Sequence, residues 1–136
     1  MEKIEILAVM ENLDQVFAFI HKGIEDQTMS EKARLRLDVA VEEIFTNIVN
    51  HAYDPETGPA RIRMELLDDP LRVQIIFSDK GKPYNPLSNE EVDVQKKMEN
   101  REVGGLGIYL LKKYTDGIRY SYEDGQNVVT IEKLLQ

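Results

Sequence analysis

Two pairs of alternating segments constrain the fold of this chain more than any other feature of its sequence. Residues 60–67 and 71–78 alternate apolar and polar side chains and are separated by the short turn Asp-Asp-Pro. Residues 117–123 and 127–134 repeat this arrangement around a Glu-Asp-Gly-Gln turn. Runs with a period of two that are joined by short turns predict β-hairpins, in which neighbouring strands are antiparallel. We therefore expect a largely antiparallel sheet.

Helices are expected to cover this sheet. Residues 3–9 read as an opening strand, and residues 12–26 carry apolar side chains at helical spacing. Ser30 begins a second, longer helix that runs to about Ala52, and a third helix is expected over 106–115. Because strands outnumber helical crossovers, we expect an α+β two-layer sandwich with a mixed, largely antiparallel sheet and the helices on one face. The 136 residues are expected to form one domain.

Composition narrows the class of function. Acidic residues outnumber basic ones by 25 to 17, and the net charge of −8 makes the chain a poor partner for nucleic-acid phosphates. The chain has no cysteine, which excludes disulfides and thiolate metal sites, and its two histidines are isolated. The N-terminus lacks the pattern of a signal peptide, and no run of about 18 apolar residues predicts a membrane span. We expect a cytoplasmic protein.

The segment 37–54 carries two stripes on one expected helix. The apolar stripe must face the core and consists of Leu37, Val41, Ile44, Ile48 and Ala52. A polar stripe of Glu43, Asn47 and Asn50 lies about 100–150° from the centre of the apolar one. Glu43 and Asn47 are one turn apart, so a carboxylate and an amide oxygen can converge on one hard cation. On the helix alone, these residues also fit an ordinary polar boundary.

Two glycine-containing segments accompany this helix. In residues 77–86, Asp79 stands at a strand end and Gly81 permits a turn or a close approach of the backbone. A buried aspartate needs a donor such as the exocyclic amine of adenine, although an ordinary aspartate turn is the alternative. In residues 102–117, three glycines precede a helix, where they either free backbone N–H groups for an anion or act as a hinge. The chain contains neither a Walker loop nor a dinucleotide-binding fingerprint.

Together and in this order, the three segments resemble a known family. EEIFTNIVNHAY, DKGKPYNP and GGLGIYLLKKYTD resemble the N box and the two G boxes of the gyrase/histidine-kinase ATPase superfamily, which has the Bergerat fold. The HAY ending, the D-x-G-x-P-[FY]-N-P form and the closing GQNVVTIEK are similar to its small anti-sigma-factor serine/threonine kinases. The resemblance covers residues 4–134. At Pro83 the chain departs from the histidine-kinase pattern, which has a second glycine there.

The resemblance implies catalytic and metal-binding roles on the expected helix. Glu43 is expected to be the general base that activates the attacking hydroxyl, and Asn47 to be the ligand of Mg²⁺. Glu42 lies about 100° away from this stripe and is excluded as the base. His51 is interpreted as a core or cap residue rather than a catalytic one.

The resemblance also implies a binding site for ATP. Asp79 is expected to hold the adenine amine, Gly81 to let the base approach, and Thr130 to support the adenine through a shared water. A further set is expected to contact the nucleotide, mainly at its phosphates: Asn50, Arg101, Gly104, Gly105, Leu106 and Gly107. An ATP lid over about residues 87–103 is expected to become ordered when ATP binds.

The function that the resemblance implies is an ATP-dependent serine/threonine protein kinase acting as an anti-sigma regulatory factor. Such a kinase phosphorylates a small anti-anti-sigma antagonist protein and sequesters a sigma factor, which regulates transcription. A homodimer is also expected, without direct contact to nucleic acid or membrane. The alternative is an ATP-binding partner-switch module with little or no kinase activity. The presence of both Glu43 and Asn47 favours the kinase.

Overall fold

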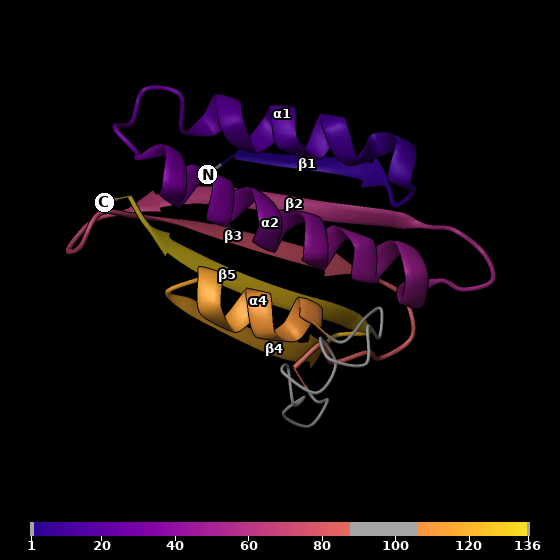
Figure 1. Cartoon of the computed structure of the whole chain (residues 1–136). Helices are drawn as coiled ribbons and strands as arrows, with labels where there is room; N and C mark the ends of the chain where they lie inside the picture. The colour runs from indigo at the N-terminus through magenta and orange to yellow at the C-terminus, as the bar shows by residue number, and fades with distance from the viewer. Residues whose placement is uncertain (1, 88–105, 136) are drawn as a thin grey trace, which may run out of the picture.

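A five-stranded sheet forms one layer of the molecule, and three helices of the described chain cover one of its faces (Figure 1). The structure, a computed structural model, describes residues 2–87 and 106–135. The strand order is β1-β2-β3-β5-β4, and every neighbouring pair is antiparallel. The expected α+β sandwich is confirmed, with a sheet that is antiparallel throughout rather than mixed.

The expected helices and strands are all present. Their bounds are β1 Glu2–Leu7, α1 Leu13–Gly23, α2 Glu31–Asn47, β2 Pro59–Leu67, β3 Arg72–Asp79, α4 Leu106–Tyr114, β4 Gly117–Glu123 and β5 Gln126–Leu134. Two single turns complete the set: the 3₁₀ turn η1 Met10–Asn12 before α1, and the π-helix η2 Ile48–Ala52 after α2. Within the described ranges, no helix is both long and apolar enough to cross a bilayer.

The central helix α2 begins where the sequence predicts it. The Ser30 hydroxyl oxygen accepts a hydrogen bond from the Ala33 N–H at 3.0 Å, which satisfies one of the donors left unpaired at a helix start. Glu31 in the first turn places a negative charge at the positive end of the helix dipole. The apolar stripe of α2 then lies on the sheet, so the helix is held mainly by burial of one face.

The core fills the space between α2 and the sheet. Ile62, Ile75 and Ile131 come from the three central strands and are fully buried. Leu37 and Ile44 of α2 belong to the same hydrophobic cluster. Each buried isoleucine contributes about 1.5–3 kcal/mol relative to an exposed one. The layer of helices is therefore fixed on the sheet by its apolar side chains.

The other face of the sheet carries the intervening residues of each strand. Ile76 of β3 lies between Arg63 of β2 and Thr130 of β5 in the strand register. Side chains one position apart on a strand point to opposite faces, so these three residues face away from the helices. This face is the side of the sheet turned from the viewer in Figure 1.

Candidate functional site

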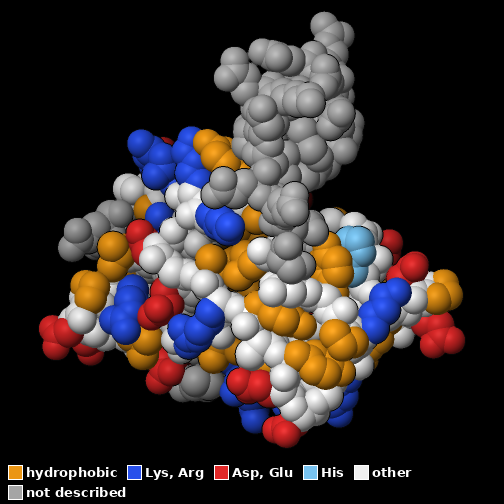
Figure 2. All heavy atoms as spheres, turned by 90° about the horizontal axis from the view of Figure 1, so that it is seen from below, with side chains coloured by type: hydrophobic (Ala, Val, Ile, Leu, Met, Phe, Trp, Pro, Cys, Tyr) orange, Lys and Arg blue, Asp and Glu red, His pale blue; other side chains and the backbone are white. Residues whose placement is uncertain are grey.

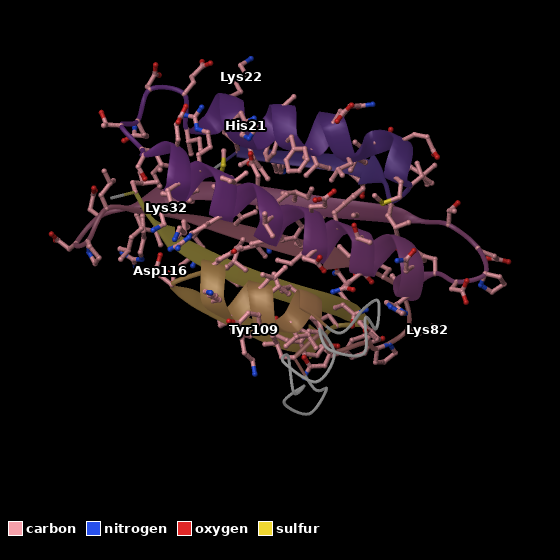
Figure 3. All side chains as sticks on the ribbon, in the orientation of Figure 1. His21, Lys22, Lys32, Lys82, Tyr109 and Asp116 are labelled. Carbon is pink, nitrogen blue, oxygen red and sulfur yellow. The ribbon has the colours of Figure 1, made fainter. Side chains whose placement is uncertain are left out.

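A shallow hollow opens at one end of the sheet, where α2 and β3 end and β5 begins. We call it the pocket, and its lining residues are Ile44, Asn47, Ile48, Ala52, Asp79, Tyr84, Pro86, Asn127 and Val129. The lining is mainly apolar, with polar atoms contributed by Asn47, Asp79 and Asn127. A concave apolar site with a few convergent polar groups is the usual form of a small-molecule binding site. Lys82, in the loop after β3, lies at this same end of the molecule (Figure 3).

The carboxylate of Asp79 is held by the protein through one oxygen only. Asp79 ends β3 and is 6% exposed. Its Oδ1 accepts hydrogen bonds from the Gly81 N–H and from Asn127 Nδ2, both at 2.9 Å. Its Oδ2 has no hydrogen-bond partner within residues 2–87 and 106–135. The second oxygen of this carboxylate therefore remains free to accept a hydrogen bond from a bound ligand.

Asn127 lines the pocket but was not predicted from the sequence. It is 4% exposed and lies opposite Asp79 in the register of β3 and β5. Nδ2 donates to Asp79 Oδ1 and to the Lys82 carbonyl oxygen, each at 2.9 Å. Oδ1 accepts from the Tyr84 N–H at 3.0 Å and from the Tyr120 hydroxyl at 2.5 Å. All donors and acceptors of the amide are used, so the side chain is fixed.

Thr130 does not support the pocket, which corrects the expectation from sequence. It is buried, but it pairs with Ile76 and lies an odd number of positions along β5 from Asn127. Alternate residues of a strand face opposite sides of the sheet, so Thr130 lies on the face away from α2. Within the described chain, the β5 side chain that contacts Asp79 is that of Asn127.

The π-helix η2 ends the polar stripe of α2 earlier than expected. A π turn closes its hydrogen bonds over five residues instead of four, so each residue rotates less around the axis than in an α-helix. Asn50 lies within this turn, is exposed, and does not line the pocket. The expected straight stripe therefore stops at Asn47, and Asn50 is not brought to the site.

The same turn holds the loop that follows β3. The Ala52 carbonyl oxygen accepts a hydrogen bond from the Lys82 N–H at 2.9 Å, and a Cβ on Gly81 would collide with that oxygen. The His51 ring stacks on the Tyr84 ring, with centroids 4.2 Å apart and planes 14° apart. Glycine at position 81 is thus required by the approach of the loop to η2. His51 is half-buried and stacks on a pocket residue, which is a structural contact.

Glu43 and Asn47 keep the positions that the helix predicted. Asn47 ends α2 and lines the pocket, and Glu43 lies one turn earlier, half-buried outside the lining. A Cβ on Gly107, in the first turn of α4, would meet the Glu43 carboxylate. Burial raises the pKa of Glu43 above its ordinary value, and the charge of the exposed Glu42 raises it further. A raised pKa makes this carboxylate a stronger base.

Several expected contacts fall where the structure gives no description. Arg101, Gly104 and Gly105 lie outside the described residues, as does the expected lid apart from Leu87. Leu106 is described only as the first residue of α4. The expected contacts of these residues with phosphates stay predictions.

Comparison with known proteins decides the family. Residues 6–133 match the family described as histidine kinase-like ATPase domain. The chain belongs to this family. Two solved structures share the fold of this ATPase domain at 14% identity. The histidine kinase domain of the blue-light activated histidine kinase from Erythrobacter litoralis has a TM-score of 0.56, covering 92% of this chain and 60% of that one. The catalytic domain of histidine kinase ThkA has a TM-score of 0.52, covering 99% and 97%.

Curated relatives of the ATPase domain are named as kinases. The serine/threonine-protein kinase BtrW of Bordetella bronchiseptica is 26% identical over 118 residues, covering 87% of this chain and 82% of BtrW. The serine-protein kinase RsbW of Bacillus mycoides is 31% identical over 97 residues, covering 68% of this chain. That match spans 59% of the length of RsbW.

The ATPase domain offers one amide to a metal ion. Within its described residues, no group of three or more His, Cys, Asp or Glu side chains could hold a metal. The Asn47 side chain lines the pocket and makes no hydrogen bond to the rest of the described chain. Mg²⁺ is commonly held by one or two protein ligands together with water and substrate phosphates. Asn47 therefore fits an ion that arrives with a nucleotide.

Proposed function

We propose that this protein is an ATP-dependent serine/threonine protein kinase that acts as an anti-sigma regulatory factor and phosphorylates a small anti-anti-sigma protein. The relatives named as serine/threonine- and serine-protein kinases support this activity. The observation that carries the proposal is the pair on α2. Glu43 has the raised pKa of a general base, and it lies one turn from Asn47 at the pocket wall.

The adenine of ATP enters the apolar end of the pocket. Ile48, Ala52 and Val129 line that end and belong to the hydrophobic core. The unpaired Asp79 Oδ2 accepts a hydrogen bond from the exocyclic amine. Guanine presents a carbonyl oxygen at the same position, where it would face a carboxylate without a proton between them. The pocket therefore favours adenine.

The phosphates extend from the base towards α4 and Asn47. Asn47 would hold Mg²⁺, and the ion would neutralise charge on the phosphates and supply electrostatic stabilisation for phosphoryl transfer. Glu43 accepts the proton from the substrate serine hydroxyl as its oxygen bonds to the γ-phosphorus and ADP leaves. A carboxylate whose pKa is raised by burial suits this proton transfer.

The partners of this kinase are the anti-anti-sigma protein and a sigma factor, in a cytoplasmic partner switch that regulates transcription. The net charge of −8 opposes direct binding to nucleic acid. A homodimer forms part of the proposal through the family resemblance.

A second function is favoured by the position of Glu43. Its carboxylate lies against Gly107 rather than in the pocket lining. If α4 keeps this place when ATP is bound, the base cannot reach a substrate hydroxyl. The protein would then be a nucleotide-dependent binding module in the same partner switch.

Single substitutions on α2 separate the two functions. The assay combines calorimetry of ATP–Mg²⁺ binding with transfer of labelled phosphate to candidate anti-anti-sigma domains. Glu43→Ala should bind ATP within about tenfold of the unsubstituted protein, while transfer falls by roughly two to four orders of magnitude. Asn47→Ala should weaken both binding and transfer, because it removes a metal ligand.

The control is Glu42→Ala, which removes the neighbouring, exposed carboxylate. At a pH well above the Glu43 pKa, this variant should bind and transfer like the unsubstituted protein. Full transfer activity in Glu43→Ala would show that Glu43 is not the base. ATP binding without transfer to any candidate domain by the unsubstituted protein would favour the binding module.

A further inference from the structure

The orientation of the Asn127 amide is dictated by its neighbours. The Tyr84 N–H can only donate, and it points at Oδ1 from 3.0 Å. The Lys82 carbonyl oxygen can only accept, and it lies 2.9 Å from Nδ2. In a flipped amide, Nδ2 would face the Tyr84 N–H, and both groups are donors. Oδ1 would face the Lys82 carbonyl oxygen, and both are acceptors. Because the residue is buried, water cannot compensate for these losses.

This fixed amide determines what Asp79 offers to a ligand. Asn127 Nδ2 and the Gly81 N–H both donate to Oδ1, so the carboxylate cannot rotate without losing two buried hydrogen bonds. Within the described chain, Oδ2 is the oxygen that remains available, and it presents an acceptor with no accompanying donor. A ligand edge that carries an N–H is therefore favoured, and one that carries a carbonyl is rejected.

Tyr120 connects the hydrogen bonds of Asn127 and Asp79 to β4, the edge strand of the sheet. Its hydroxyl, on β4, is the one side-chain donor to Asn127 Oδ1 within the described chain, at 2.5 Å. Tyr122, two residues further, is the register partner of Asn127 but is 45% exposed. Its hydroxyl has no hydrogen bond to the described residues, and Tyr122 is one of the exposed large apolar or aromatic side chains of the described chain. Side chains of this kind also gather on the surface seen from below (Figure 2). The two tyrosines thus form a matched pair, of which Tyr120 alone hydrogen-bonds to Asn127 within the described chain.

We propose that Asn127 and Tyr120 are positioning residues that set the base specificity of the pocket. Tyr120 orients the Asn127 amide, the amide fixes the Asp79 carboxylate, and the carboxylate selects a purine with an exocyclic amine at C6. This inference rests on the proposed nucleotide site and adds the residues that make it selective. Both residues act on the base through Asp79, so their substitution should change selectivity for the base before it changes phosphoryl chemistry.

The test compares binding of ATP and of inosine triphosphate, which has a carbonyl at C6, in the presence of Mg²⁺. Calorimetry on the full chain gives the ratio of the two affinities. Tyr120→Phe should reduce the preference for ATP about two- to fivefold, and Asn127→Leu should reduce it about tenfold or more. Affinity for inosine triphosphate should stay within about twofold. Tyr122→Phe should keep both affinities of the unsubstituted protein.

A purely structural role would lower both affinities together and leave their ratio unchanged. That outcome in folded Tyr120→Phe and Asn127→Leu would overturn the inference. If Asn127→Leu does not fold, Tyr120→Phe decides alone, since it removes one hydroxyl and keeps the ring. A protein that prefers ATP equally in every folded variant contradicts only this inference. An unsubstituted protein that binds neither nucleotide contradicts the proposed function and this inference with it.

Discussion

At Glu43 two physical effects act in the same direction. Partial burial next to Gly107 disfavours the ionised form, and the negative charge of Glu42 disfavours it further, so the pKa rises. The ionised form is the base. Phosphoryl transfer should therefore decline as the pH falls through this raised pKa, which gives the rate profile an acid limb.

Glu42→Gln should move the acid limb to lower pH. The substitution removes the smaller of the two causes, so the pKa of Glu43 moves back towards its ordinary value, while burial still holds it above. The plateau at higher pH should not change. The measurement is kcat/KM for transfer against pH. Glu31→Gln removes a charge from the first turn of the same helix and should leave the limb in place. A limb that stays fixed in Glu42→Gln would rule out the charge effect.

Some residues of the site could be predicted from the sequence and others could not. Glu43, Asn47 and Asp79 were predicted because their chemistry follows from a helix stripe and a strand end. Thr130 was assigned to the adenine site through the family resemblance, but it lies on the face of the sheet away from the pocket. In the run Gln-Asn-Val-Val-Thr-Ile, two adjacent valines leave open which set of alternate residues is buried. Asn127 follows a turn, where asparagine is common for local reasons, so its contact with a residue 48 positions away gave no signal.

At the scale of elements, the helices and hairpins were predictable because their periods differ clearly. The π-helix η2 was not. Ile44, Ile48 and Ala52 are spaced four apart and would continue an α-helical stripe without a break. What favours the wider turn is tertiary contact. The Ala52 carbonyl oxygen bonds to the loop after β3, and the His51 ring stacks on Tyr84.

The close approach of this loop to η2 predicts a strong effect of Gly81→Ala. The added Cβ would collide with the Ala52 carbonyl oxygen, so the loop must move away from η2 and carry Tyr84 with it. We expect ATP affinity to fall at least about tenfold and stability to fall by about 1–3 kcal/mol, the usual cost of overpacking. Calorimetry and urea unfolding measure the two effects.

The control is Gly117→Ala. Gly117 begins β4, and a Cβ added there would have room. The nearest atom to its added Cβ, an oxygen of Glu132, is 3.4 Å away, an ordinary contact. This variant should bind ATP like the unsubstituted protein. Unchanged ATP affinity in Gly81→Ala would show that the loop position does not matter for binding.

At the scale of the whole molecule, the pocket and the hydrophobic core share a wall. Ile44, Ile48, Ala52 and Val129 belong to both. A ligand in the pocket therefore contacts side chains whose burial holds α2 on the sheet. Binding should consequently stabilise the entire fold and not only the loop beside the site.

Thermal unfolding tests this coupling. ATP with Mg²⁺ at about 100 times its dissociation constant should add about 2.7 kcal/mol to the free energy of unfolding and raise the Tm in one cooperative transition. Asn47→Ala at the same ligand concentrations should show a smaller rise, because its affinity is lower. Two separate transitions, only one of which responds to ATP, would show that the pocket and the core unfold independently.

Both described ends of the chain lie at the same end of the molecule (Figure 1). On β2, Ala60 pairs with the pocket residue Asp79, whereas Met64, further along the strand, pairs with Glu2. Glu2 therefore lies away from the pocket. β5 likewise starts beside the pocket and ends at Leu134, roughly 27 Å away at the usual rise per strand residue. A protein tethered to a sensor surface through either terminus would therefore present its nucleotide-binding end to solution. Reporters fused beyond Glu2 and Leu135 would likewise lie away from the pocket end of the molecule.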